Sequence, residues 1–459
     1  MCFIAQIIHH FYFREGVSML NFELSDAQKK LQEKAREFAL KHVLPEAWSA
    51  DENDTLPLHV LEKAFHEELM NSDIPVEYGG KGYGLVEGAI ITEEISAACP
   101  GIATSLFDNS LGLEPIILSG NTEAKQKYLT QAANDFKLIC FATSEATMGS
   151  DVSSIRCRAK KDGDDYILNG TKFWITNAGV ADFITVFATV DPEASHKGIC
   201  AFVVEKQWDG VSTGQPIPKL GQRSSNTAAI AFKNVRVPKE NVLAEPGKGF
   251  ILAMQTFSRT RGIIGAFAVG AARSAMEFAI SYAKKRKAFG SPLSGFQALQ
   301  FKIAEMFQKV EISRLLVLKA AWEADQQKDP TISASIAKVY ATESAWQVAD
   351  EALQIFGGYG YTRMFPIEKL LRDIRLYRIY EGTSEVQRMI LAGHVLANYT
   401  PVMPPLDELP VTRDLSGMEN GETVWRCSMC GHVHCKGKLP DQCPICLFPG
   451  KIFKPVKTN

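Results

Sequence analysis

The hydrophobic residues in the first part of the chain repeat with the spacing of an amphipathic α-helix. Between residues 25 and 70, apolar residues recur three and four positions apart, and Ser25 can cap the first turn. The same spacing returns over Glu87–Ala98 and Glu123–Ala133. We therefore predict a mainly helical domain over residues 21–140.

The pattern changes over residues 141–248, where short runs rich in Val, Ile, Phe and Thr replace the helical spacing. Such runs are typical of β-strands. The strand candidates are Phe183–Val190, Gly198–Val204 and Ala228–Val237. Tyr166–Thr176 predicts a hairpin, because its central Asn169-Gly170 pair suits the positive φ of a tight turn. This part should form a small β domain.

Helical spacing resumes over residues 249–398 and predicts a helical bundle. The most regular segments are Gly262–Lys285, which is rich in Ala and Gly, Gln297–Asp325 and Ile332–Phe356. Residues 399–421 contain four prolines and no periodicity, so they predict a linker. A last small domain would then occupy residues 422–459.

Composition and charge narrow the class of protein. A chain of 459 residues is too long for one hydrophobic core, and 46% hydrophobic with 22% charged residues is ordinary for a soluble globular protein. The net charge of −2 provides no basic field that would favour a nucleic acid or a membrane surface. No run of about 18 apolar residues is present, so we expect no membrane span.

The first residues do not continue this pattern. Met1–Phe13 is apolar, but no basic residue precedes the apolar stretch and no small-residue cleavage site follows it, which is a poor match to a signal peptide. A second methionine, Met19, lies just before the helical domain. We therefore expect residues 1–20 to be a non-structural extension or a mis-called start.

Four cysteines near the C-terminus form two Cys-x-x-Cys motifs separated by twelve residues. They are Cys427, Cys430, Cys443 and Cys446. Two such pairs build a tetrahedral tetrathiolate site for zinc or a single iron. Without a secretory signal, metal binding is favoured over disulfides, and a reducing cytoplasm is the expected compartment. Cys435 lies outside both motifs and is expected to remain a free thiol.

The residues around these motifs resemble the rubredoxin-like domain of rubrerythrins. Trp425 precedes the first motif, Pro440 precedes the second, and Phe453 follows it. The resemblance implies iron, with zinc as the alternative. Leu447 departs from it, because a glycine normally relaxes the turn after the fourth cysteine.

The segment Tyr380–Thr383 lies between two helical stretches, so Glu381 is placed in a short loop before a helix. Thr383 or Ser384 can cap that helix, and Ser384 with Gln387 has the spacing of a capping box. A carboxylate in such a loop can project into a cleft. On its own, however, a loop glutamate is more often a solvated side chain, so its role depends on the other motifs.

Four further segments accompany this loop. They are Phe141–Glu145 followed by Gly149-Ser150-Asp151, then Trp174–Asn177, then Arg286–Gly290 with Gln297, and then Gln354–Gly358. In this order, over residues 21–398, the five segments resemble the acyl-CoA dehydrogenase family. The resemblance implies a multidomain α+β fold with an N-terminal α-helical domain, a middle β-barrel-like domain and a C-terminal four-helix bundle. The rubredoxin-like metal domain follows it here.

By this resemblance, Glu381 is the catalytic base of a FAD-dependent acyl-CoA dehydrogenase. It takes the α-proton of the thioester while hydride leaves the β-carbon for the flavin, which yields the 2-enoyl-CoA. A closed apolar site would raise the pKa of Glu381 toward neutrality by desolvation. Thr260 matches the position at which other branches of the family carry the base, and a threonine cannot serve as one.

The resemblance also implies which residues bind cofactor and substrate. The residues expected to hold FAD are Phe141, Ser144, Gly149, Ser150, Trp174, Thr176, Arg286, Phe289, Gln297, Gln354, Gly357, Gly358, Thr383 and Glu385. The residues expected to bind the substrate are Ser150, Ser258, Arg261, Tyr380 and Gly382. Ala146, Met148 and Ser258 depart from the family pattern, so the identity of the acyl chain of the substrate is left open. The motifs nevertheless lean toward short-chain members of the family.

The resemblance implies a homotetramer, because the far end of the cofactor usually meets a neighbouring subunit. Reduced FAD would pass electrons singly to the tail iron and then to an external carrier such as an electron-transfer flavoprotein. Such an enzyme of fatty acid metabolism is expected in the cytoplasm of an anaerobic prokaryote. The alternatives are an enoyl-CoA reductase that runs the same site in reverse, and a catalytically silent flavoprotein with a zinc-ribbon interaction module.

Overall fold

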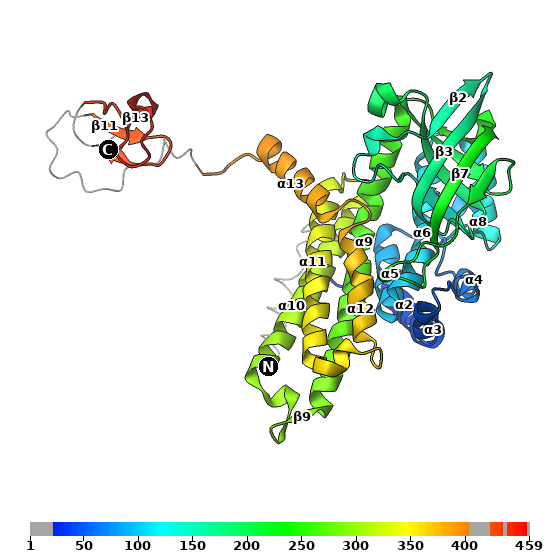
Figure 1. Cartoon of the computed structure of the whole chain (residues 1–459), viewed down its shortest axis with the longest axis horizontal. Helices are drawn as coiled ribbons and strands as arrows, with labels where there is room; N and C mark the ends of the chain where they lie inside the picture. The colour runs from blue at the N-terminus through cyan, green and yellow to red at the C-terminus, as the bar shows by residue number, and fades with distance from the viewer. Residues whose placement is uncertain (1–21, 404–422, 435–437, 457–459) are drawn as a thin grey trace, which may run out of the picture. The chain divides into compact units, whose positions relative to one another are not determined.

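The computed structural model describes residues 22–403, 423–434 and 438–456, and the chain divides into two compact units after Ala392 (Figure 1). The expectations for residues 1–20, for most of the linker and for Cys435 lie outside the described residues. The first unit contains the helical and β domains, and the second contains the four cysteines of the two Cys-x-x-Cys motifs.

The N-terminal helices form where the hydrophobic spacing predicts them, except for the helix over Pro100–Leu118, which the spacing does not predict. They are α2 (Asp26–Phe38) with a π-helical turn over Ala39–Val43, α3 (Ala47–Glu52), α4 (Leu58–His66), α5 (Leu85–Ala98), α6 (Pro100–Leu118), α7 (Thr122–Ala124) and α8 (Thr130–Asn134). Ser25 caps α2 through a capping box with Gln28, and Leu31, Ala35 and Phe38 are buried along one face. α5 and α6 are buried along most of their length and pack against the C-terminal helices.

The middle of the chain forms one eight-stranded sheet. Its strands are β1 (Ile139–Ala142), β2 (Arg158–Asp162), β3 (Asp165–Thr176), β4 (Phe183–Thr189), β5 (Ile199–Glu205), β6 (Val211–Thr213), β7 (Thr227–Val237) and β8 (Val242–Ala244), in the order β6-β7-β3-β2-β4-β5-β8. β1 pairs in parallel with the first half of β4. The buried strands β4 and β5 form the centre of this domain. The three strand candidates are confirmed to within one residue at each end.

The predicted hairpin at Asn169-Gly170 is wrong. β3 continues through this pair, and the tight turn lies earlier, at Gly163-Asp164 between β2 and β3. Gly170 instead marks a register shift in the pairing of β3 with β7. It has a φ of +148°, and a Cβ atom there would lie 2.7 Å from the Cα atom of Cys157. The glycine therefore serves a close approach of two backbones, not a turn.

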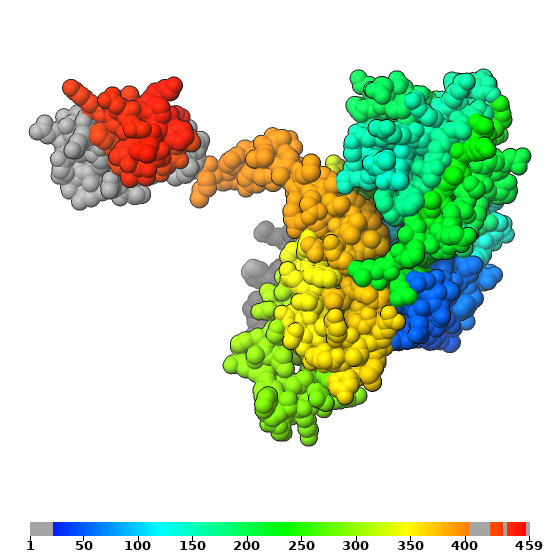
Figure 2. All heavy atoms as spheres, in the orientation of Figure 1, coloured from blue at the N-terminus to red at the C-terminus, as the bar shows by residue number. Residues whose placement is uncertain are grey.

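Three long helices and two shorter ones follow the sheet. They are α9 (Lys248–Lys285), α10 (Gln297–Asp325), α11 (Thr331–Phe356), α12 (Ile367–Ile374) and α13 (Ser384–Asn398), with the short hairpin β9 (Lys287–Ala288) and β10 (Ser291–Pro292) between α9 and α10. α9 packs against α5, α10 and α11. Its glycines allow this: a Cβ atom on Gly265 would lie 2.5 Å from Val317, and one on Gly270 would lie 2.2 Å from the Glu93 carbonyl oxygen. The β domain and these helices adjoin on the face shown in Figure 2.

By length and composition alone, α9 could cross a membrane, and it is the one helix of the described residues that could. However, 78% of its most apolar window is buried inside the protein. The helix also carries Arg259 and Arg273, which form ion pairs with acidic residues of α6 and α5. This environment is typical of the core helix of a globular domain.

The second unit contains a small sheet beside the two Cys-x-x-Cys motifs. Its strands are β11 (Val424–Cys427), β12 (Val433–His434) and β13 (Phe453–Val456), in the order β12-β11-β13. Cys427, Cys443 and Phe453 form its small core. Because so few side chains are buried, we expect a bound metal to contribute most of the stability of this unit.

Substitution of Gly170 by alanine should destabilise the first unit, because the added Cβ atom would collide with the backbone of Cys157. We expect a loss of about 2–3 kcal/mol in the free energy of unfolding. Gly120→Ala is the matched control, since a Cβ atom there has nothing within 4 Å. Urea unfolding of the two variants measures the difference, and equal stability would contradict the role given to Gly170.

Candidate functional site

The loop between α12 and α13 contains two successive residues in the left-handed region of backbone conformation. Glu381 has a φ of +54° and Gly382 a φ of +83°. Glycine adopts this region freely, but a glutamate there needs stabilisation by its surroundings. The loop ends where the Thr383 hydroxyl accepts a hydrogen bond from the backbone N–H of Val386 at 3.2 Å. Of the two predicted caps of α13, Thr383 is the one that is used.

Three buried side chains hold the carbonyl oxygens of this loop. Lys338 Nζ, on α11, donates to the Gly382 carbonyl at 2.7 Å. Gln387 Nε2, on α13, donates to the same oxygen at 3.0 Å, and Arg261 Nε, on α9, donates to the Glu381 carbonyl at 3.3 Å. Because the donors come from three different helices, the packing of the helical domain determines the conformation of the loop.

The Glu381 carboxyl group lies beside α9. The Thr260 hydroxyl is 3.3 Å from Glu381 Oε2 and can donate a hydrogen bond to it. Burial raises the pKa of Glu381 to about 7, although Arg261, the Thr260 hydrogen bond and Lys338 all act to lower it. Part of the side chain remains accessible. Such a carboxylate can accept a proton near neutral pH. Thr260, which is predicted to match the position of the base in other branches of the family, thus lies next to Glu381.

Lys338 is not among the predicted site residues. It is fully buried, and desolvation lowers its pKa to about 7 even though the charge of Glu381 acts to raise it. The sequence contains one signal for it: Lys338 lies between Ala334 and Ala345, in a part of α11 whose buried residues are mostly small. A lysine among such residues is unusual. A charged group at such a position requires a polar partner, and the Gly382 carbonyl is that partner.

Two of the predicted cofactor segments lie side by side. The backbone N–H of Phe173 donates to the Ser144 carbonyl at 2.9 Å. Lys172 Nζ lies 2.8 Å from Glu145 Oε1 and donates to the Thr143 carbonyl at 2.9 Å, and the side chains of this ion pair are almost completely buried. The ion pair fixes the loop after β1 to strand β3. It therefore holds the first cofactor segment against the second.

Several buried polar atoms near these segments have no partner among the described residues. They are Ser105 Oγ on α6, Thr143 Oγ1 and Asn177 Oδ1. Beside them, Trp174 has a φ of +57° and an exposed fraction of 51%. Buried polar atoms are normally paired, so unpaired ones near an exposed aromatic ring indicate a ligand with a flat face and a polar edge. The residues present fit a flavin.

The other predicted cofactor residues of this region differ in burial. Phe141 belongs to the core of the β domain, so it would support the loop. Ser144 and Thr176 are half-buried, with hydroxyl groups available to a ligand, whereas Gly149 and Ser150 are exposed. Their assignment as FAD contacts stays a prediction.

A second set of predicted cofactor residues lies at the far end of α9. Arg286, Gly357 and Gly358 line a pocket of ≈ 570 Å³, where the Arg286 guanidinium lies 5.8 Å from the ring centre of Tyr359. The other members of this set, Phe289, Gln297 and Gln354, are exposed. Arg286 follows Arg261 by 25 residues, which corresponds to roughly 38 Å along a helix. Within one chain, Arg286 therefore lies far along α9 from Arg261 and the Glu381 loop.

The predicted substrate residues are divided in a similar way. Arg261, Tyr380 and Gly382 belong to the Glu381 loop or contact it. Ser258 is one turn further toward the start of α9 and hydrogen-bonds the first residue of α11 at 3.0 Å. Glu385, predicted to contact the cofactor, is exposed in the first turn of α13. The residues nearest the base are therefore the three of the first group.

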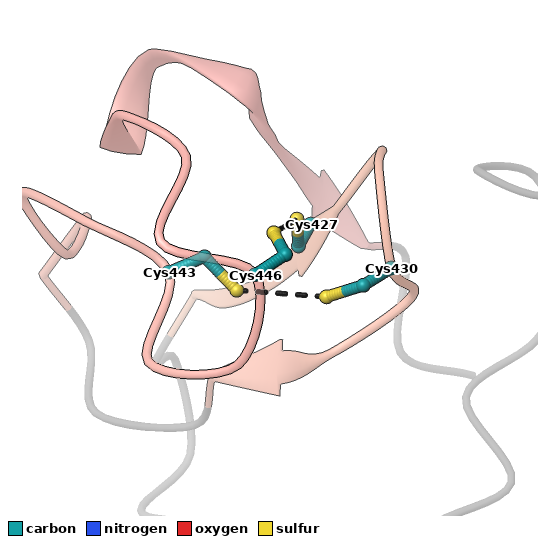
Figure 3. Close-up of side chains that lie close together, drawn as sticks. All are labelled: Cys427, Cys430, Cys443 and Cys446. Carbon is teal, nitrogen blue, oxygen red and sulfur yellow. Dashed lines mark hydrogen bonds between the residues drawn. The ribbon is translucent and has the colours of Figure 1, made fainter.

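The four tail cysteines converge (Figure 3). Their sulfur atoms all lie within 4.8 Å of one another, with 3.5 Å between Cys427 and Cys446 and 3.6 Å between Cys430 and Cys443. A disulfide requires about 2.05 Å, whereas four sulfurs at about 2.3 Å from one metal are roughly 3.8 Å apart. The arrangement fits a tetrathiolate metal site. Leu447 has a φ of +59°, where a glycine is expected.

Family models match both units of the chain. They are Acyl-CoA dehydrogenase, N-terminal domain, over residues 25–135; Acyl-CoA dehydrogenase, middle domain, over residues 140–235; Acyl-CoA dehydrogenase, C-terminal domain, over residues 247–396; and Rubrerythrin, rubredoxin-like domain, over residues 425–454. The last match contains all four cysteines of the tetrathiolate site.

Individual proteins show the same similarity. Short-chain specific acyl-CoA dehydrogenase, mitochondrial, of Mus musculus is 41% identical over 379 residues, which is 82% of this chain and 92% of that protein. The structure of butyryl-CoA dehydrogenase from Megasphaera elsdenii is 36% identical with a TM-score of 0.80, covering 82% of this chain and 100% of that one. A chain from work on the electron transferring flavoprotein of Acidaminococcus fermentans is 37% identical with a TM-score of 0.80, covering 83% and 100%.

Replacement of Lys338 by methionine should raise the pKa of Glu381 further, because the charge of Lys338 acts to lower it. Glu381 would then become ionised only at higher pH. Infrared spectra recorded against pH, with Glu381→Gln as the reference, measure this pKa through the carboxylate band. Lys338→Arg keeps the positive charge and is the matched control. An unchanged Glu381 pKa in Lys338→Met would show that the two groups are not coupled.

Proposed function

Because the chain belongs to the acyl-CoA dehydrogenase family, we propose that it oxidises a short-chain acyl-CoA to the 2-enoyl-CoA with Glu381 as the base. It is an acyl-CoA dehydrogenase of the butyryl-CoA or short-chain type with a rubredoxin-like domain. The observation that carries the proposal is the half-buried Glu381 carboxyl group, whose pKa burial raises to about 7. A carboxylate with this pKa is more basic than an exposed one.

The same loop supplies a hydrogen-bond donor for the thioester. Lys338, Gln387 and Arg261 occupy the two loop carbonyls, whereas the backbone N–H of Glu381 makes no hydrogen bond with the described part of the chain. This N–H can donate to the thioester oxygen and stabilise the negative charge that develops there. The α-proton becomes more acidic as a result, and the Glu381 carboxylate accepts it.

The segments around Ser144 and Trp174 would hold FAD, which when bound supplies the acceptor for the hydride of the β-carbon. The hydroxyl groups of Ser144 and Thr176 can hydrogen-bond its polar edge, and the exposed Trp174 ring can cover a face. The unpaired Thr143 Oγ1 and Asn177 Oδ1 support this placement. The Lys172–Glu145 ion pair would keep these groups in position.

The enzyme would work as an oligomer, proposed to be a homotetramer. Arg286 lies about 38 Å along α9 from Arg261, which contacts the Glu381 loop, so the Arg286 set would serve the cofactor of a neighbouring subunit. α10 offers a surface for such a neighbour. Its exposed apolar residues Phe301, Phe307, Leu315 and Trp322 fall within an arc of about 120° on one face.

The tail would carry iron and relay electrons, which we propose from its four thiolates and its similarity to a rubredoxin-like domain. Cys430 is exposed, so one metal-ligating sulfur would lie at the surface, where a redox partner can approach. A single iron accepts one electron at a time, which suits transfer away from a two-electron flavin. The final acceptor would be an electron-transfer flavoprotein or a similar carrier.

Substitution of Glu381 by glutamine should remove the base while keeping the shape of the loop. We expect the rate of flavin reduction by butyryl-CoA to fall by about 10³-fold or more, with FAD still bound. Stopped-flow absorbance of the flavin under anaerobic conditions measures this rate. Glu123→Gln, at an exposed position on α7, is the control and should react at the wild-type rate. Flavin reduction at the wild-type rate in Glu381→Gln would refute the assigned base.

Metal analysis of the full-length protein should give about one iron per chain in addition to flavin, as expected for a single tetrathiolate site. Cys430→Ser removes one of the four ligands and should lower both the iron content and the visible thiolate absorption. The control is Met429→Ala, which changes an exposed neighbour and leaves the ligands intact. Stoichiometric zinc in place of iron would overturn the electron-relay role.

A further inference from the structure

Asp108 differs from every other buried acidic residue in the described part of the chain. The buried acidic side chains are Asp51, Glu93, Glu94, Asp108, Glu114, Glu145 and Asp373. Six of these form an ion pair with a lysine or arginine. Asp108 forms none, and its Oδ2 atom has no hydrogen-bond partner among the described residues. Buried polar groups of this kind require an explanation.

Asp108 lies close to the Glu381 loop. It is one turn along α6 from Thr104, whose hydroxyl is 3.5 Å from the Tyr380 hydroxyl. Burial raises the pKa of Asp108 well above its ordinary value, and the charge of Glu381 raises it further. Asp108 in turn contributes, after burial, to the raised pKa of Cys140 on β1. The side chain therefore lies among α6, the Glu381 loop and the strand that leads into the first cofactor segment.

An unpaired carboxyl group in such a position is unfavourable for folding. Its burial without a hydrogen bond costs free energy, and an apolar residue of similar size would avoid that cost. Costs of this kind are retained at functional sites, where a ligand provides the missing partner. The other buried acids each form an ion pair with a lysine or arginine, and Asp108 has no such partner.

We propose that Asp108 is a specificity residue, which hydrogen-bonds an uncharged polar group, such as a hydroxyl, on the acyl chain of the substrate. This inference rests on the proposed function, and it narrows the substrate class from short acyl chains to short acyl chains with a hydroxyl group or a comparable group.

We infer that the ligand group that Asp108 binds is uncharged, because Asp108 lies close enough to Glu381 for the two charges to interact. Glu381 must be ionised to accept the α-proton, and two ionised carboxylates in one enclosed site repel each other. With Asp108 in its neutral form, Glu381 can ionise without this repulsion. A neutral carboxylic acid both donates and accepts a hydrogen bond, which matches a hydroxyl group and not an ammonium group.

Two thioesters of equal chain length test the proposal. 4-Hydroxybutyryl-CoA and pentanoyl-CoA differ only in a terminal hydroxyl or methyl group. We expect the wild-type enzyme to prefer the hydroxyl compound by about tenfold or more in kcat/KM for flavin reduction. Asp108→Leu should reverse this ratio, and Asp108→Asn, which keeps a hydrogen-bonding side chain, should retain part of it.

Thermal unfolding of the enzyme without substrate provides a readout besides activity. Asp108→Leu should raise the Tm by roughly 2–4 °C, because it removes an unpaired buried carboxyl group. Glu114→Leu is the matched control on the same helix and should lower the Tm, because it leaves Arg259 without its carboxylate. A structural role for Asp108 would lower the Tm in both variants.

The possible outcomes separate the two proposals. If butyryl-CoA reduces the flavin but the hydroxyl-to-methyl ratio is the same in wild type and Asp108→Leu, the role of Asp108 is wrong and the proposed function stands. A lower Tm, or failure to fold, in Asp108→Leu also overturns the role of Asp108. If none of the three thioesters reduces the flavin, the proposed function fails, and this inference fails with it.

Discussion

The hydrogen bond from Lys338 to the Gly382 carbonyl is the interaction on which the active loop depends. A glutamate at positive φ is unfavourable by about 1–3 kcal/mol, and hydrogen bonds from charged donors contribute about 1.5–3 kcal/mol each. Lys338 and Arg261 are such donors, and they come from α11 and α9. The close packing at Gly265 holds α9 against its neighbours, so the loop has its shape only when the helical domain is fully packed. The geometry of the Glu381 loop and the stability of the helical domain are therefore linked.

The same lysine also sets the electrostatic balance of the site. Desolvation raises the pKa of Glu381 to about 7 and lowers that of Lys338 to about 7, while the attraction between their charges opposes both shifts. The charge of each group therefore acts on the pKa of the other. Arg261 adds a second buried positive charge beside Glu381. A proton accepted by the carboxylate changes the charge of a small enclosed cluster, which makes the site sensitive to anything that alters its desolvation.

The sequence predicts elements well where a periodic pattern decides them. The long helices over Gln297–Asp325 and Thr331–Phe356 were located by the spacing of apolar residues alone. The Asn169-Gly170 pair is wrong as a turn signal because a backbone contact with Cys157, which precedes the paired strand β2, determines the need for glycine there. Lys338 and Asp108 could not be assigned for a related reason. Whether a charged residue is buried, and whether it finds a partner, depends on helices that are distant in sequence.

The separation of Arg286 from the Glu381 loop follows from the length of α9. Its 38 residues contain Arg261 and end just before Arg286, so the helix sets the distance between these two arginines. The order of the five motifs along the sequence therefore does not show whether Arg286 and Glu381 serve the same cofactor. The helix carries Arg261, beside the proposed base, near its first third, and Arg286, a predicted FAD residue, follows its last residue, so a single chain would offer half of each of two cofactor sites. Under the proposed oligomer a second copy of the chain would complete each half, and the exposed apolar face of α10 would then be a contact surface and not a defect of the fold.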